Sequence, residues 1–240
     1  MKYYLLPLLC LVAACNKPAP QPDVTTGLVA DIRLNGEGYD LVSNTTGTAY
    51  NITATENRYG LANRAVHFNA ADSAYINFGD LEGLSFTNGA FTISCFVKVE
   101  DTSKPVAVLS KRGINGPWEY SLDNHFNHAW FNLDNWVEGG NPSVYGVDPL
   151  DASATIHTGH WQHLAYVADG STLRVYVDGA QQPGIDSLTP GAYFTNTNAH
   201  FVIGNGGAYN KNWYFTGAID DIKIYNRALE PAAIALLSIQ

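Results

Sequence analysis

Aromatic residues placed among glycine, asparagine and aspartate are the part of this chain best suited to binding a ligand. They lie in irregular segments, and the members of this set are Trp118, Trp136, Tyr209 and Trp213. The apolar face of a sugar can stack on such a ring while amides and carboxylates bind its hydroxyl groups. Each ring could instead pack its own loop, and Trp118 shares strand parity with Tyr120 and Leu122, which suits the core. As a set, they favour a carbohydrate ligand.

Paired carboxylates would indicate another chemistry, the hydrolysis of glycosidic bonds. The glutamates are scattered, and only Glu119, with Asp123 four residues later, sits within a plausible strand, on the face opposite Tyr120 and Leu122. Exposed acidic residues at a sheet edge explain that pair more simply. The sequence also has no Gly-x-Ser-x-Gly elbow and no phosphate-binding loop. The chain is therefore predicted not to be an enzyme, with a glycoside hydrolase as the minor alternative.

Three histidines, His157, His160 and His163, recur every three residues, a spacing that suggests zinc ligands. Gly159 and the strand-like run 161–164 exclude one helix face as their common support. A zinc site is therefore not predicted.

Short strands must position these side chains, because apolar alternations broken by Gly, Asn, Asp and Pro recur at intervals of about ten residues. The clearest alternation runs from Phe91 to Val99 and predicts a strand across the middle of a sandwich. Other expected strands are 28–34, 65–68, 75–78, 106–111, 118–122, 129–133, 161–168, 173–178 and 201–204. The segment 204–213 is expected to be a loop. This pattern predicts an all-β antiparallel sandwich.

The last strand changes its buried face partway along. Phe215, Gly217 and Ile219 have one parity, whereas Ile222 and Ile224 have the other. A bulge at Asp220-Asp221 is the expected cause. Pro231 then suits the first position of a short C-terminal helix.

The charge and the cysteines restrict the partners and the stabilising links. The chain carries a net charge of −9, and loss of Lys2 with residues 1–14 would make it −10. An acidic chain is poorly suited to nucleic acid or to anionic lipid. Cys95 alternates with Ile93 and Val97, so it is expected to be a buried apolar residue without a disulfide partner.

The amino terminus has a short apolar stretch, Leu5 to Ala14, which is too short for a membrane-spanning helix. It ends in Leu11-Val12-Ala13-Ala14-Cys15 and resembles a bacterial lipoprotein signal. The resemblance implies removal of residues 1–14 and acylation of Cys15, which would hold the protein on a membrane. An ordinary secretory signal is the alternative. The proline-rich segment up to Thr26 suits a flexible tether, so the domains expected are 1–14, 15–26 and 27–240.

Several motifs in order resemble those of laminin-G-like domains: Leu34-Asn35-Gly36, Tyr59-Gly60-Leu61-Ala62, Gly159-His160-Trp161, Val175-Tyr176-Val177-Asp178-Gly179 and Phe215 to Leu229. The resemblance covers residues 27–240. It implies a concanavalin A-like jelly-roll β-sandwich of two antiparallel sheets with a short C-terminal helix, in which the last strand pairs beside the first. The Glu-x-Asp-x-x-Glu run of hydrolases on this fold is missing.

Many members of this family hold a structural calcium ion between the loop after the first strand and the turn of the last. Oxygen ligands are available at Asn35, Asp40, Asn44 and Asp220, of which Asp40 and Asp220 match family positions. The resemblance therefore implies a structural Ca²⁺ site, although Asp220 and Asp221 could instead bind backbone amides at the bulge.

The expected function is non-catalytic binding of a carbohydrate by a lipoprotein anchored outside the cytoplasm, at the outer membrane. A cell-surface protein is the alternative partner, which would make the chain an accessory subunit of an outer-membrane nutrient importer. Function on this fold depends on its loops, so the fold alone does not decide between these partners.

Overall fold

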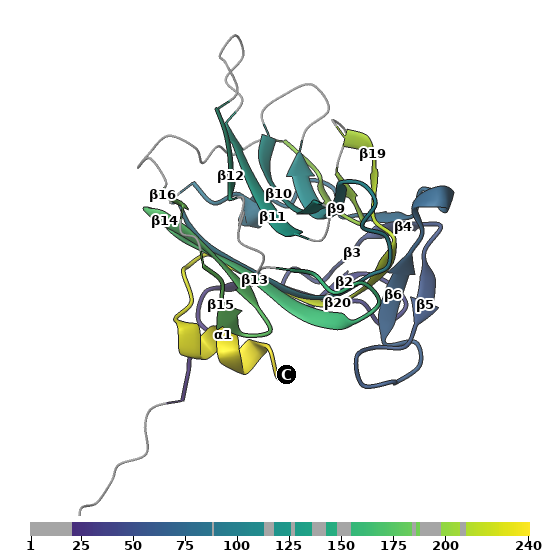
Figure 1. Cartoon of the computed structure of the whole chain (residues 1–240), viewed down its shortest axis with the longest axis horizontal. Helices are drawn as coiled ribbons and strands as arrows, with labels where there is room; N and C mark the ends of the chain where they lie inside the picture. The colour runs from purple at the N-terminus through teal and green to yellow at the C-terminus, as the bar shows by residue number, and fades with distance from the viewer. Residues whose placement is uncertain are drawn as a thin grey trace, which may run out of the picture.

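The computed structural model describes a sandwich of two large antiparallel sheets (Figure 1). The residues it describes are 21–87, 89–112, 118–125, 128–135, 143–147, 155–183, 186–187, 198–206 and 210–240. The predicted signal and Cys15 lie outside them. Among the described residues, no helix is both long and apolar enough to cross a bilayer.

Sheet A is the larger sheet, and its main path runs in the order β15-β14-β13-β8-β20-β1-β2-β3. Off this path, β16 pairs with β14, β6 with β20, and β5 with β6. The strands of sheet A are β1 (Leu28–Arg33), β2 (Tyr39–Asp40), β3 (Thr45–Thr46), β5 (Thr53–Thr55), β6 (Ala65–Phe68), β8 (Ala90–Val99), β13 (Trp161–Asp169), β14 (Thr172–Val177), β15 (Ala180–Gln181), β16 (Asp186–Ser187) and β20 (Gly217–Tyr225).

Sheet B has the order β12-β11-β10-β9-β17-β7-β4. Its strands are β4 (Thr48–Tyr50), β7 (Tyr75–Asn77), β9 (Val106–Arg112), β10 (Trp118–His125), β11 (His128–Asn135), β12 (Ser143–Val147) and β17 (Phe201–Ile203). A two-stranded sheet joins β18 (Asn205–Gly206) to β19 (Asn210–Tyr214), so part of the predicted loop 204–213 is a hairpin. Short 3₁₀ helices span η1 (Ala70–Asp72) and η2 (Glu82–Leu84).

The core lies between the sheets, where alternate residues of β8, such as Ile93, Cys95 and Val97, are fully buried. Strand β8 pairs with β13 on one side and β20 on the other, which confirms its predicted central place. Burial raises the pKa of the Cys95 thiol to about 12, as expected for an apolar site.

The last strand confirms two predictions. It pairs beside β1, and its pairing with β8 shifts register between Asp220 and Lys223, where the bulge was expected. The helix α1 (Pro231–Leu237) follows with Pro231 at its start, also as predicted. Helix α1 packs on the outer face of sheet A, over Ala165, Val167 and Tyr225 (Figure 1).

Candidate functional site

A strip of buried polar side chains lies on the outer face of sheet B. Leu109 and Leu122 are register partners that face the core, so the neighbouring partners Ser110 and Ser121 face outward. Ser121 Oγ donates a hydrogen bond of 2.9 Å to Asp123 Oδ2, and Ser110 Oγ donates one of 2.9 Å to the carbonyl of Asn205. Burial of polar groups is costly unless they are paired, so these residues form a defined site and not a random surface.

Arg112 brings a positive charge to this strip. Its guanidinium lies 3.9 Å from Asp123 Oδ2, and the side chains of both residues are buried. We call Ser110, Arg112, Ser121, Asp123 and Asn205 the polar strip. Together they offer hydroxyl, carboxylate, amide and guanidinium groups, which are the partners that sugar hydroxyls use.

Three tyrosines form an aromatic platform on the same face of sheet B. Tyr50 and Tyr75 are register partners whose rings stack with centroids 4.4 Å apart and planes 15° apart. The neighbouring Ile76 faces the core, so Tyr75 faces outward. Tyr214 of β19 packs against Tyr75 with centroids 6.3 Å apart. Burial, followed by the two neighbouring phenols, raises the pKa of Tyr75.

The backbone register shows that the platform and the polar strip share a face. Asn77 pairs with Val202, Val202 pairs with Ser110, and Ser110 pairs with Ser121. At about 4.8 Å per strand, the platform strand β7 and the strip strand β9 are roughly 10 Å apart. The buried polar strip therefore lies beside the platform on the same face of sheet B.

Sequence reasoning missed the three platform tyrosines. Tyr50 lies in β4, a three-residue strand of exposed residues with no alternation to reveal it. Tyr214 directly follows the segment 204–213 that was expected to be a loop, and no strand was predicted at its position. The only sequence signal was the parity of Tyr75, which is opposite to that of the buried Ile76.

The predicted aromatic residues have different outcomes. Trp136 and Tyr209 lie outside the described residues, and Trp118 is placed only by its backbone, as the register partner of Arg112. Trp213 is half-buried in β19, directly before the platform residue Tyr214. The ligand site predicted at these four residues therefore stays a prediction.

The two candidate catalytic carboxylates are held by different cations. Glu119 Oε1 accepts hydrogen bonds from Lys111 Nζ at 2.9 Å and from Ser85 Oγ at 3.1 Å. The pairing of β10 with β9 shifts register between Trp118 and Tyr120, at Glu119. Asp123 instead belongs to the polar strip with Arg112. The arrangement thus gives no support to a shared acid and nucleophile pair.

The four predicted calcium ligands do not form an oxygen cage. Asp40 Oδ1 accepts the backbone N–H groups of Asp31 and Val42, and Oδ2 accepts the N–H and the hydroxyl of Ser43. Asn35 and Asn44 are exposed. Asp220 faces an arginine, so a cation already neutralises it. The contacts of Asp40 and Asp220 do not fit a calcium ion, and the site stays a prediction from the sequence.

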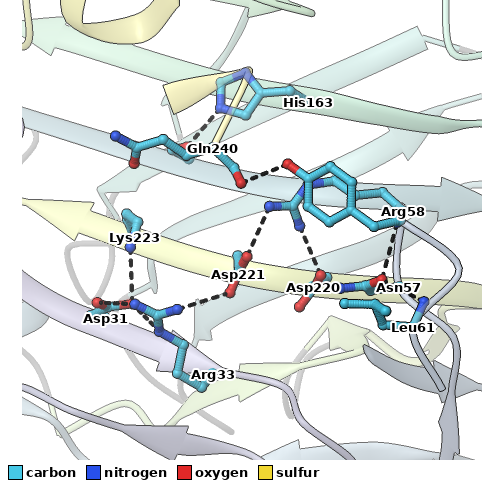
Figure 2. Close-up of polar contacts among 12 residues, drawn as sticks. Asp31, Arg33, Asn57, Arg58, Leu61, His163, Asp220, Asp221, Lys223 and Gln240 are labelled. Atoms are coloured by element: carbon cyan, nitrogen blue, oxygen red, sulfur yellow. Dashed lines mark hydrogen bonds and ion pairs between the residues drawn. The ribbon is translucent and has the colours of Figure 1, made fainter. Parts of the chain in front are cut away.

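Figure 2 shows a ladder of alternating charges on the outer face of sheet A. Lys223 contacts Asp31 at 3.2 Å, Asp31 contacts Arg33 at 2.9 Å, and Arg33 lies 3.7 Å from Asp221. We call these four residues, together with Arg58 and Asp220, the charge ladder.

Arg58 completes the ladder at the β20 bulge. Its guanidinium contacts Asp220 at 2.8 Å and Asp221 at 3.1 Å. It also lies over the ring of Phe96, with Cζ 3.8 Å from the centroid. The side chain of Arg58 is only 9% exposed, so these pairs are shielded from water. Sequence reasoning missed Arg58, because no local pattern links it to aspartates 162 residues away.

The three histidines whose spacing suggested zinc ligands have different surroundings. His157 and His160 are exposed, whereas His163 is buried and its Nε2 lies 2.8 Å from Ser94 Oγ. Across the part of the chain that the structure describes, no three His, Cys, Asp or Glu side chains gather as a metal site would require.

Two buried groups give the stability a testable pH dependence. Burial, with a smaller effect of Arg58, lowers the pKa of His163 to about 4. Burial and Asp221 raise the pKa of Asp220 to about 7 despite Arg58. Because folding lowers the pKa of His163, the contribution of His163 to stability is complete above pH 6.5. This contribution is lost as the pH falls toward 4. Because folding raises the pKa of Asp220, the contribution of Asp220 to stability is complete below pH 3.8. This contribution is lost as the pH rises toward 7.

His163 and Asp220 change the free energy of unfolding with pH in opposite directions, each by at most about 1.4 kcal/mol per pH unit. Single substitutions should separate the two effects. Relative to the wild type, His163→Gln should gain stability as the pH falls from 6.5 to 4.5, and Asp220→Asn should lose it. Urea unfolding at pH 4.5, 5.5 and 6.5 measures both. If both variants kept the wild-type slope, the two groups would not titrate as described.

The two large antiparallel sheets, packed face to face, define a jelly-roll sandwich protein. A laminin G family model, described as the concanavalin A-like lectin/glucanases superfamily, matches residues 69–235. The chain therefore belongs to this superfamily, which confirms the resemblance found in its motifs. A search of the curated protein sequences found no match.

Solved structures of this fold resemble most of the chain. Domain 4 of AbnA, a GH43 extracellular arabinanase from Geobacillus stearothermophilus in complex with arabinotriose, is 23% identical with a TM-score of 0.66, over 88% of this chain and 98% of that domain. The binding domain of Paraclostridial Mosquitocidal Protein 1 is 16% identical, with a TM-score of 0.67, over 88% of this chain and 52% of that one.

A third similar structure is of botulinum neurotoxin type C, whose cell entry depends on interaction with two ganglioside molecules. It is 12% identical with a TM-score of 0.61, over 89% of this chain and 51% of that one. The chain thus spans about half of each toxin structure. At these identities the likeness shows the shared fold.

Proposed function

We propose that this protein is a non-catalytic carbohydrate-binding lipoprotein, anchored through Cys15 at the outer membrane. The observation that carries the proposal is the aromatic platform beside the polar strip on one face of sheet B. Tyr50 stacks on Tyr75 with one side of its ring and is 42% exposed, so its other side is free to stack on a sugar.

The side chains of the polar strip are at most 7% exposed, so the strip would support this face beside the platform and would not contact the sugar directly. Two of the similar structures come from proteins whose ligands contain sugars, arabinotriose and gangliosides, which is consistent with this proposal. The anchor is supported by the signal-like segment ending at Cys15.

Removing the exposed ring should weaken binding. In a glycan panel with residues 21–240, Tyr50→Ala should reduce the affinity for the best ligand by at least tenfold, which is about 1.4 kcal/mol. Tyr50→Phe keeps the stacking surface and should retain most of the affinity. Tyr59→Ala is the matched control, because Tyr59 is an exposed tyrosine that contacts Arg58, over sheet A.

Calorimetric titration of the selected glycan would measure these affinities. Equal affinity of the wild type, Tyr50→Ala and Tyr75→Ala would contradict the platform as the binding site. A panel without any binding would instead favour the alternative partner, a protein.

A further inference from the structure

The start of the described chain is fastened to the outer face of sheet A. Tyr225 Oη donates a hydrogen bond of 3.1 Å to the Val24 carbonyl, and Arg227 Nε donates one of 2.7 Å to the Thr26 carbonyl. Arg227 also lies 3.3 Å from the Asp23 carboxylate. Val24 packs against the cluster formed beneath α1. The chain therefore leaves the domain beside α1 (Figure 1).

The proposed anchor leaves little freedom to the domain. Asp23 lies eight positions after Cys15 in the chain. At about 3.5 Å per residue, this stretch spans at most about 28 Å even when fully extended. The point at which the chain leaves the domain, beside α1, is therefore held within about 28 Å of the lipid.

Exposed apolar side chains lie on that same face. Tyr59 is 57%, Leu61 is 56% and Ile239 is 76% exposed. The turn 57–61 is joined to the end of α1, because Tyr59 Oη donates a hydrogen bond of 2.7 Å to the Gln240 carbonyl. The adjacent Arg58 lies over Phe96, whose neighbours in β8 face the core, which places this turn on the outer face of sheet A.

The charge on this face is balanced. In the charge ladder, three cations alternate with three carboxylates, so the ladder has no excess positive charge to attract anionic lipid. A few apolar side chains bind a bilayer weakly by themselves. Tethering changes this, because the anchor keeps them at a high effective concentration beside the lipid.

We propose that Tyr59, Leu61 and Ile239, which we call the apolar edge, rest on the lipid surface and orient the anchored domain. This inference rests on the proposed anchor. Because the aromatic platform lies on the outer face of the opposite sheet, it then points away from the membrane. The orientation presents the sugar site to large polysaccharides that could not enter between the domain and the lipid.

Site-directed labelling of the full-length protein tests this orientation. Leu61→Cys lies on the apolar edge, and Thr48→Cys is the matched control, because Thr48 is exposed in β4 of sheet B. Cys95 is fully buried, and its raised thiol pKa, about 12, keeps it unreactive. Each variant is purified from membranes, labelled with bimane and reconstituted through its own anchor into phosphatidylcholine vesicles. Lipid carrying a nitroxide headgroup then quenches labels near the surface.

Quenching at position 61 should exceed that at position 48 by at least threefold, and should not depend on added anionic lipid. Equal quenching at the two positions, or stronger quenching at position 48, would overturn the orientation but not the anchor. A chain recovered only in the soluble fraction would overturn both. Glycan affinity measured on the same preparations tests the binding function separately.

Discussion

Replacing Gly217 with alanine should lower the free energy of unfolding by about 4 kcal/mol, from backbone strain together with overpacking. Gly217 has a φ of +141°, which residues with a side chain rarely adopt. A Cβ atom there would lie 2.1 Å from the Lys98 carbonyl oxygen. Both partners belong to central strands of sheet A, with Gly217 paired to Val99 and Phe68, so neither backbone can move without breaking its pairing.

Gly83→Ala is the matched control. A Cβ atom at Gly83 would meet nothing within 4 Å, so the change should stay within about 0.5 kcal/mol of the wild type. Urea unfolding followed by tryptophan fluorescence measures both variants. Similar midpoints for the two alanine variants would show that β20 relaxes around Gly217.

Replacing Arg58 with methionine should cost about 3 to 5 kcal/mol, the range for removing one partner of a buried ion pair. Methionine keeps much of the apolar volume over Phe96 but leaves Asp220 and Asp221 without their shared cation. The cost comes from the lost ion pairs in a site with little water, where Asp220, whose pKa is already about 7, takes up a proton and Asp221 keeps its charge.

The double variant Arg58→Met, Asp220→Asn should recover part of this loss, because asparagine is neutral without taking up a proton. Arg64→Met is the control, since Arg64 is an exposed arginine in the same connection between β5 and β6. Thermal unfolding by circular dichroism at pH 7 compares the four proteins. If Arg58→Met melted together with Arg64→Met, the ion pairs would not stabilise the fold.

Strands with long alternation were predictable because burial in a sandwich has a period of two residues. The expected strand 91–99 matches β8 within one residue, and 65–68 matches β6. Strands β2 to β5 contain two or three residues each and carry no such pattern. They form because edges of the two sheets are free to pair with them, a condition that the local sequence does not record.

The candidate functional site shows the same division. The sequence indicated aromatic and polar segments, among them Trp213 next to the platform residue Tyr214, but it gave no reason to group Tyr50 with Tyr75 and Tyr214. These tyrosines are brought together by the register of β4 with β7 and by the position of β19. Register between remote strands follows from packing of the whole sandwich, so it could not be derived from any one segment.

By itself, the sequence determined the all-β class, the buried face of each long strand, the bulge at Asp220-Asp221 and the C-terminal helix. Each depends on parity or turn chemistry within about ten residues. Only the tertiary structure decided that Arg58 faces Asp220, and that one outer face carries both the aromatic platform and the polar strip. Those contacts join residues far apart in the chain, and only the closed sandwich brings them within reach.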